Sequence, residues 1–250
     1  MTNNNSKKIR LNRFIAMCGV CSRRKADALI KEGKIVVNKK VIDNLGFQVS
    51  IEDTVLLNGQ KIFPENKKYI LLNKPRGYIT TMKDEKGRRT VMSLVINACK
   101  ERLVPVGRLD KDTTGLLLFT NDGLLAKKLT HPTYQVAKTY HVFLDKNLNL
   151  KDLEFIKNGI TLEDGFVKPD SISYIDNGSA KGVKINVHIG KNRIVRRIFE
   201  HLNYKVLELD RVEYAIFKKE KLKKGRWRVV TNREIHVLNK KIASFVNLFK

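Results

Sequence analysis

The chain has 250 residues, with 50 lysines and arginines against 25 acidic residues, which gives a formal net charge of +25 and a pI near 10.0. Because 42% of the residues are hydrophobic, the chain has enough apolar material for packed cores and is not a disordered basic tail. The charge favours a polyanionic partner, nucleic acid before an acidic membrane, because no apolar run approaches the roughly 20 residues that span a bilayer.

The first sixty residues predict a small unit of their own. Residues 1–10 are polar and lack the apolar core of a secretory signal, so we expect a cytoplasmic protein. Two short helices are predicted over 11–18 and 22–30, because apolar residues recur there at helical spacing and a serine can cap the second helix. Short strands are predicted over 35–37 and 54–57, the second before an Asn-Gly hairpin signal.

Cys18 and Cys21 form a CxxC pair between the two predicted helices. A zinc site would need a second pair of ligands, and a redox site would need a thioredoxin-like strand and helix pattern. The sequence contains neither, so we interpret the two cysteines as packing residues and expect no metal site.

Basic residues crowd the second predicted helix and the turn after it, where only Asp27 and Glu32 oppose them. The cations of this stretch are Arg23, Arg24, Lys25, Lys31, Lys34, Lys39 and Lys40. A solvated helix face is the common explanation of such a run. In a chain with this net charge, however, a face of this kind suits the binding of phosphates.

A short charged link over 65–68 separates this unit from a longer segment in which predicted strands and helices are mixed. The strands are predicted over 69–73, 116–120, 138–144, 183–189 and 206–211, and the helices over 91–99, 124–130, 150–158 and 194–202. This order predicts an α+β fold in which the helices pack on a mixed sheet.

Residues 107–123, GRLDKDTTGLLLFTNDG, place one carboxylate, that of Asp110, between a turn and a very apolar strand. Arg108 and Lys111 flank it with positive charge, which favours the ionised form of a carboxylate. An anionic carboxylate in such a position can act as a nucleophile. An aspartate that only caps a turn would give the same local sequence.

Three further segments carry candidate site residues. Residues 74–77, KPRG, end a strand with a rigid turn whose cations suit a phosphate contact or the anchoring of a neighbouring loop. Residues 138–142, KTYHV, place Tyr140 on a strand, where its ring can stack on a base. Residues 190–197, GKNRIVRR, form a glycine turn before a basic helix, where amides and guanidinium groups can meet a phosphate or a carboxylate.

Two resemblances connect these segments. The stretch RLNRFIAMCGVCSRRKADALIKEGKIVVNKKVI resembles the S4 RNA-binding domain. The combination of KPRGY, GRLDKDTTGLLLFTNDG, KTYHV and GKNRIVRRIFEHLNYKV resembles the RsuA/RluB/RluE/RluF family of RNA pseudouridine synthases, from about residue 9 to about residue 235. The resemblance implies a small S4 domain over 9–64, followed by a mixed-sheet catalytic domain over 68–240.

The same resemblance implies isomerisation of uridine to pseudouridine in ribosomal RNA, with neither a metal nor an organic cofactor. Asp110 matches the catalytic aspartate of the family, and Tyr140 matches the tyrosine expected to stack on the uracil and help remove its C5 proton. Arg196 matches the arginine expected to pair with the aspartate. The residues expected to hold the RNA are Arg23, Arg24 and Lys25 in the S4 domain and Lys74, Arg108, Arg193 and Arg197 in the catalytic domain.

The segments HPTYQVAKTYHV and LEDGFVKPDSISYID are more similar to the branch that modifies 23S rRNA of the large subunit than to the small-subunit branch. We therefore expect a monomer that acts on 23S rRNA or on a ribosome-assembly intermediate, without a membrane partner. The alternatives are a synthase specific for 16S rRNA and a noncatalytic ribosome-binding or assembly factor built on an S4 domain. A catalytically dead relative would have lost Asp110 or Tyr140, and both are present.

Overall fold

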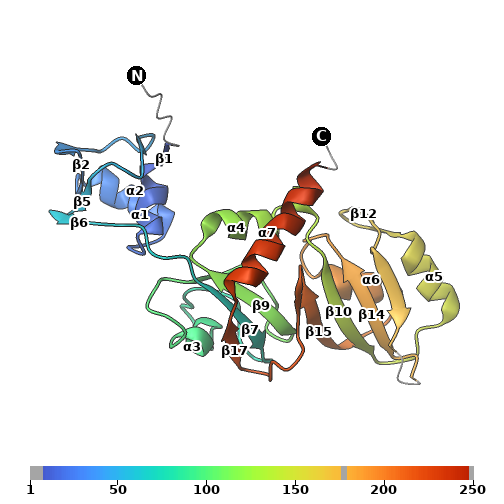
Figure 1. Ribbon diagram of the computed structural model, residues 1–250. Helices are drawn as coiled ribbons and strands as arrows, with labels where there is room; N and C mark the ends of the chain where they lie inside the picture. The colour runs from blue at the N-terminus through green and yellow to red at the C-terminus, as the bar shows by residue number, and fades with distance from the viewer. Residues whose placement is uncertain (1–7, 176–178, 248–250) are drawn as a thin grey trace. The chain divides into compact units, whose positions relative to one another are not determined.

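The computed structural model describes residues 8–175 and 179–247 and divides the chain into two compact units. The first unit contains the described residues up to Lys68, together with the short segments Lys100–Leu103 and Asn121–Gly123. The second contains Tyr69–Cys99, Val104–Thr120 and the described residues from Leu124 onward. Figure 1 draws most of the first unit in blue and the second in green to red.

The first unit consists of two helices and several short strands, as the sequence predicts. Its elements are β1 (Ile9–Arg10), α1 (Leu11–Met17), α2 (Arg23–Lys31), β2 (Ile35–Val37), β3 (Lys40–Val41), β4 (Gln48–Val49), β5 (Val55–Leu57) and β6 (Gln60–Lys61). β3, β2, β5 and β6 form a four-stranded sheet in that order, and β1 pairs with β4. The Ser22 hydroxyl accepts a hydrogen bond from the Lys25 amide at 3.3 Å, which caps α2.

Helix α2 presents an apolar face to the core and a basic face to solvent. Ala26 and Ile30 are fully buried, whereas Arg23, Arg24 and Lys25 are exposed. The three cations predicted to hold RNA therefore lie on one turn of helix that solvent reaches, and they remain candidate phosphate contacts.

The two cysteines of the CxxC pair contribute to this core. Burial, and then the nearby carboxylate of Glu65, raise the pKa of Cys18 to about 12, and burial also raises the pKa of Cys21. Both thiols therefore keep their protons at neutral pH, whereas metal binding and disulfide exchange use the thiolate. Their chemistry agrees with a packing role.

The second unit is built on a mixed sheet of nine strands. These are β7 (Tyr69–Lys74), β8 (Val104–Pro105), β9 (Thr114–Thr120), β10 (Lys138–Leu144), β13 (Ser171–Tyr174), β14 (Gly182–Val187), β15 (Val206–Tyr214), β16 (Phe217–Lys218) and β17 (Trp227–Val229). The order is β13-β14-β10-β15-β9-β7-β17, with β16 beside β15 and β8 beside β9. Among the strand pairs described for this sheet, β9 and β15 run parallel and the others antiparallel.

Helices and one hairpin complete this unit: α3 (Met92–Val95), α4 (Gly123–Thr130), the 3-10 turn Pro132–Tyr134, α5 (Leu150–Asn158), the hairpin of β11 (Ile160–Leu162) and β12 (Gly165–Val167), α6 (Ile194–His201) and α7 (Asn232–Asn247). α4 and α7 cover the same part of the sheet (Figure 1), because Leu125 and Leu238 share a core with Leu116 and Leu118 of β9. No helix in the described part of the chain is both long and apolar enough to cross a membrane.

The helix predicted over 91–99 is wrong beyond its first turn. α3 spans only Met92–Val95, and the chain then turns away. Val91 and Val95 are buried, whereas Ile96 is 73% exposed, so the apolar periodicity of this stretch does not continue into a packed helix face.

The two halves of the sheet meet at the short parallel pairing of β9 with β15, where Thr114 lies opposite Asp210 and Gly115 opposite Arg211. Gly115 has a φ of +108°, and a Cβ atom there would lie 2.3 Å from the carbonyl oxygen of Arg211. Only glycine permits this approach of the two backbones. The Thr114 hydroxyl also donates to Asp210 Oδ1 at 2.7 Å, so a side-chain bond reinforces the join.

Candidate active site

A cleft of about 380 Å³ opens in the second unit beside this join. Its walls come from five separate segments: the loop over 106–113 before β9, the end of α4, β10, the stretch over 189–195 that leads into α6, and β15. Asp110, Tyr140 and Arg193 therefore line one cavity, although they are far apart in the sequence. The cleft brings together three of the four segments that the sequence singled out.

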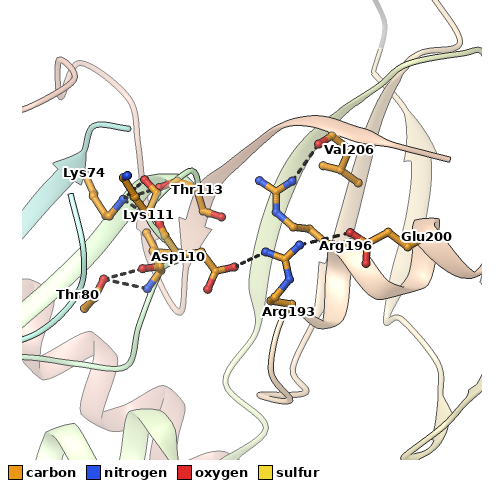
Figure 2. Close-up of polar contacts among 10 residues, drawn as sticks. Lys74, Thr80, Asp110, Lys111, Thr113, Arg193, Arg196, Glu200 and Val206 are labelled. Carbon is orange, nitrogen blue, oxygen red and sulfur yellow. Dashed lines mark hydrogen bonds and ion pairs between the residues drawn. The ribbon is translucent and has the colours of Figure 1, made fainter. Parts of the chain in front are cut away.

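The backbone around Asp110 is held in place by buried side chains from neighbouring segments (Figure 2). Lys74 Nζ donates to the carbonyl oxygens of Asp110 at 2.9 Å and of Thr113 at 2.8 Å, and it lies 3.2 Å from that of Lys111. The Thr80 hydroxyl donates to the Leu109 carbonyl at 2.7 Å and accepts from the Leu109 amide at 3.2 Å. The loop is thus fixed through its main chain, while the Asp110 side chain stays 39% exposed.

The structure corrects the prediction that Lys74 contacts RNA. Its side chain is fully buried at the end of β7, and main-chain carbonyls already accept the hydrogen bonds of its ammonium group, so it has no donor left for a phosphate. Burial lowers the pKa of Lys74 to about 8, against the opposing effect of Asp110 and Asp112. The anchoring role, which the same sequence motif also suggested, is the one its hydrogen bonds support.

The arginine that meets Asp110 is Arg193, and the predicted ion pair with Arg196 is not the one observed. Arg193 Nη1 lies 3.6 Å from Asp110 Oδ2, and its Nη2 lies 3.3 Å from Glu200 Oε1 (Figure 2). Arg196 is 7% exposed, and its Nη1 donates to the Val206 carbonyl at 2.9 Å. Arg193 immediately precedes α6 with a φ of +47°, whereas Arg196 lies within the helix on its buried side.

Two residues of β10, Lys138 and Tyr140, also line the cleft. Tyr140 is 9% exposed, with its ring in the cleft wall. Lys138 Nζ donates to the carbonyls of Val136 and His188, both at 2.9 Å. Burial, and then repulsion from Arg211, lower the pKa of Lys138 to about 8, with Asp170 opposing the shift. The cleft thus has a cationic wall around the exposed carboxylate of Asp110.

Of the remaining predicted RNA contacts of this unit, Arg108 lines the cleft and Arg197 is not among the lining residues. Arg108 is exposed in the cleft lining. Arg197 makes a bidentate contact with Asp164, at 2.7 and 3.0 Å, which lowers the pKa of Asp164 to about 2. Arg197 already has a carboxylate partner, so of these two residues Arg108 is the freer cation for a phosphate.

Thr113 and Arg211 are among the residues of the cleft wall that were not predicted as site residues. Thr113 lies within the segment 107–123 that carries Asp110. Arg211 lies two residues after Leu209, on the same face of β15. An arginine at an inward-facing strand position was the available signal, because charged side chains are rarely buried without a specific partner.

Comparison with known proteins identifies the families that the two units match. A family model described as RNA pseudouridylate synthase matches residues 68–201, and a model of the S4 domain matches residues 9–62. Over 230 residues the chain is 43% identical to ribosomal large subunit pseudouridine synthase B of Bacillus subtilis, covering 90% of this chain and 93% of that protein. It is 40% identical over 238 residues to an uncharacterized RNA pseudouridine synthase of Aquifex aeolicus, covering 94% and 95%.

A solved crystal structure of a pseudouridylate synthase superimposes with a TM-score of 0.66 at 29% sequence identity, covering 92% of this chain and 99% of that one. The likeness in structure therefore extends over nearly the whole chain, as the likeness in sequence does.

Proposed function

Because this chain belongs to the family of RNA pseudouridylate synthases and carries an S4 domain, we propose that it converts uridine to pseudouridine in the ribosomal RNA of the large subunit. The choice of the large subunit rests on the 43% identity to the Bacillus subtilis enzyme, which is named for that subunit. We also infer that the protein acts in the cytoplasm as a monomer. In support of a monomer, Asp110, Tyr140 and Arg193 already line one cleft within a single unit of the chain.

The observation that carries the proposal is the exposed carboxylate of Asp110 in a cleft of nucleotide size, held by a loop with a fixed main chain. Asp110 acts as the nucleophile that attacks the target nucleotide. The bond between N1 and the ribose C1′ breaks, the uracil turns, and a bond between C5 and C1′ replaces it. C5 gives up a proton and N1 gains one, so the product is an isomer of the substrate.

Tyr140 and the arginines serve the same nucleotide. The target uridine must leave its stack to reach the cleft, and an aromatic ring in the wall gives the extruded base a new stacking surface. Tyr140 takes this role and assists removal of the C5 proton. Arg193 holds the Asp110 carboxylate in the free enzyme at 3.6 Å, and Arg196 connects α6 to β15 through its hydrogen bond to the Val206 carbonyl. Arg108 holds a flanking phosphate.

A map of pseudouridines in ribosomal RNA, from cells with and without this protein, tests the proposal. We expect the loss of a large-subunit pseudouridine that the wild-type gene restores. Loss from small-subunit RNA alone would overturn the choice of substrate. An unchanged map of both subunits would overturn the proposal on ribosomal RNA and favour a noncatalytic factor.

Binding of the target RNA should weaken steeply with salt, because cations of both units neutralise phosphates. For about five phosphate contacts to single-stranded RNA, affinity should fall by about 100-fold between 50 and 200 mM salt. Replacing Arg23, Arg24 and Lys25 together by glutamine should reduce the slope of log affinity against log salt by about 2. Filter binding at several salt concentrations measures both. An unchanged slope would remove α2 from the RNA-binding surface.

Activity should fall on the alkaline side with an apparent pKa near 8, because Lys74 then loses the positive charge that holds the Asp110 loop.

The contribution of Lys74 to stability should rise with pH over the range in which activity falls. The pKa of Lys74 is about 8 in the folded protein, against the ordinary lysine value of 10.5 in the unfolded chain, so the unfolded chain binds more protons between these values. The contribution of Lys74 to the free energy of unfolding therefore rises with pH in that window.

Lys138, whose pKa is also about 8, provides the control for this pH profile. Lys138→Arg keeps a positive charge throughout the range. The fall in activity near pH 8 should persist in this variant. Its disappearance would assign the titration to Lys138 and contradict the role of Lys74.

A further inference from the structure

Arg211 is a residue of the cleft wall that the mechanism above does not use. It lies on β15, is 2% exposed, and contributes to the lining of the cavity. In the sheet it is directly opposite Tyr140 of β10 on one side and opposite Gly115 of β9 on the other. It therefore lies at the join of the two half-sheets, beside the ring on which the target base stacks.

The guanidinium group of Arg211 is only partly satisfied. Its Nε donates to the Leu116 carbonyl at 2.7 Å, and its central carbon lies 4.6 Å from the centroid of the Tyr214 ring. Nη2 is buried and has no hydrogen-bond partner in the part of the chain that the structure describes. An arginine side chain stays protonated in proteins, so Nη2 remains a donor. A buried donor without an acceptor destabilises the folded protein.

Thr113 shows the same feature from the other side of the join. This residue lines the cleft and is 2% exposed, and its hydroxyl has no partner among the described residues. Two residues that line a single cavity, one from the Asp110 loop and one from β15, thus each carry a buried polar group with no partner in the described part of the chain. Unpaired buried polar groups are rare in folded proteins, and at a binding cleft their natural partners are ligand atoms.

The position beside Tyr140 indicates which part of the substrate meets Arg211. Residues directly opposite on neighbouring antiparallel strands have adjacent side chains. A base stacked on the Tyr140 ring therefore presents its edge to Arg211. Nη2 can only donate, so the edge must offer an acceptor, and uracil offers two carbonyl oxygens, O2 and O4.

We propose that Arg211 is a specificity-determining residue that donates a hydrogen bond from its guanidinium to a carbonyl oxygen of the extruded uracil. The Thr113 hydroxyl is a second unpaired polar group on a residue of the same cleft wall. This inference rests on the proposed function, because it names what reads the base in that reaction. A site built to hydrogen-bond one group rejects analogues that lack it, since its own polar atoms would then stay unpaired.

The turning of the ring gives this donor a particular advantage. For C5 to replace N1 at the ribose, uracil turns about the line through N3 and C6, and this rotation exchanges the places of O2 and O4. A fixed donor therefore meets a carbonyl oxygen before and after the turn. Cytosine carries an amino group at C4, so in one of its two orientations it would present a donor to Arg211.

Arg211→Gln is the matched variant for a test. The side-chain amide nitrogen of glutamine occupies about the place of arginine Nε, so it can keep the bond to the Leu116 carbonyl while Nη2 is removed. The substrates are three RNAs that carry uridine, 2-thiouridine or 4-thiouridine at the target, because sulfur is a weaker acceptor than oxygen. Single-turnover rates and RNA affinity are measured for both proteins, together with their melting temperatures.

The wild-type protein should convert at least one thiouridine RNA about 10-fold more slowly than the uridine RNA. Arg211→Gln should be about 10-fold slower on uridine and should show no further loss with that thiouridine, at unchanged RNA affinity. Equal thio effects in both proteins would overturn the inference. A wild-type protein that converts all three RNAs at equal rates would also overturn it. This comparison uses the wild-type protein alone, so it does not depend on whether the variant folds. A wild-type protein that forms no pseudouridine in the uridine RNA would overturn the proposed function itself.

Discussion

Asp110→Asn is expected to lower the single-turnover rate of pseudouridine formation by at least about 10⁴-fold, because it removes the nucleophile while keeping the size of the side chain. The loop should keep its shape, since Lys74 and Thr80 hold it through the main chain of Asp110 and Leu109 and not through the carboxylate. RNA affinity should be equal or slightly higher, because one negative charge leaves a cleft that receives a polyanion. Rapid-quench kinetics and filter binding measure the two quantities.

Asp112→Asn is the matched control for this variant. Asp112 lies two residues further along the same loop, its side chain is 58% exposed, and it pairs with Arg76 at 3.4 Å. The substitution makes the same change of charge at nearly the same place, and we expect activity to stay within about 2-fold, since exposed ion pairs contribute little. If Asp110→Asn kept activity close to that of Asp112→Asn, Asp110 could not be the nucleophile.

The features of the site that can be predicted from the sequence are those carried by residues that are contiguous in the chain. The turn, the flanking cations and the apolar strand of 107–123 lie side by side in the chain, and the structure confirms the strand as β9. Tyr140 was predicted on a strand for the same reason, because the alternation over 138–144 is local. Local pattern is enough where the neighbours in space are also neighbours in sequence.

The features that the sequence does not predict depend on which side of an element faces the core. Arg193 and Arg196 are three residues apart in one basic run, and only the left-handed backbone of Arg193 and the burial of Arg196 decide which one meets Asp110. The KPRG turn is compatible with an exposed or a buried Lys74, and only the structure shows that its side chain is buried. Arg211 is far from Asp110 and Tyr140 in sequence and reaches them only through the pairing of β15 with β9 and β10. Such choices are made by tertiary packing, which a single sequence does not display.

Lys74→Met should lower the rate of pseudouridine formation by about 10²- to 10³-fold while RNA affinity changes less than about 3-fold. A displacement of about 1 Å at a reacting group is sufficient for a loss of this size. Methionine fits the buried space but donates no hydrogen bond, so the carbonyl of Thr113 loses a bond of 2.8 Å to a cation. The Asp110 carbonyl keeps its bond from the Thr113 amide at 3.1 Å, and that of Lys111 keeps the one from the Gly77 amide at 2.8 Å. The loop should therefore shift and not unfold.

The effect on stability separates this anchoring role from a contact with RNA. Loss of hydrogen bonds to a buried cation costs about 1–3 kcal/mol, and removal of a desolvated charge offsets part of that cost. We expect the free energy of unfolding in urea to fall by about 1–2 kcal/mol. Lys157→Met, which removes an exposed lysine of α5 paired only with Glu154 at 3.1 Å among the described residues, should change neither rate nor stability measurably. A Lys74→Met protein with a normal single-turnover rate and weakened RNA binding would instead assign Lys74 to the RNA and contradict its role as the anchor of Asp110.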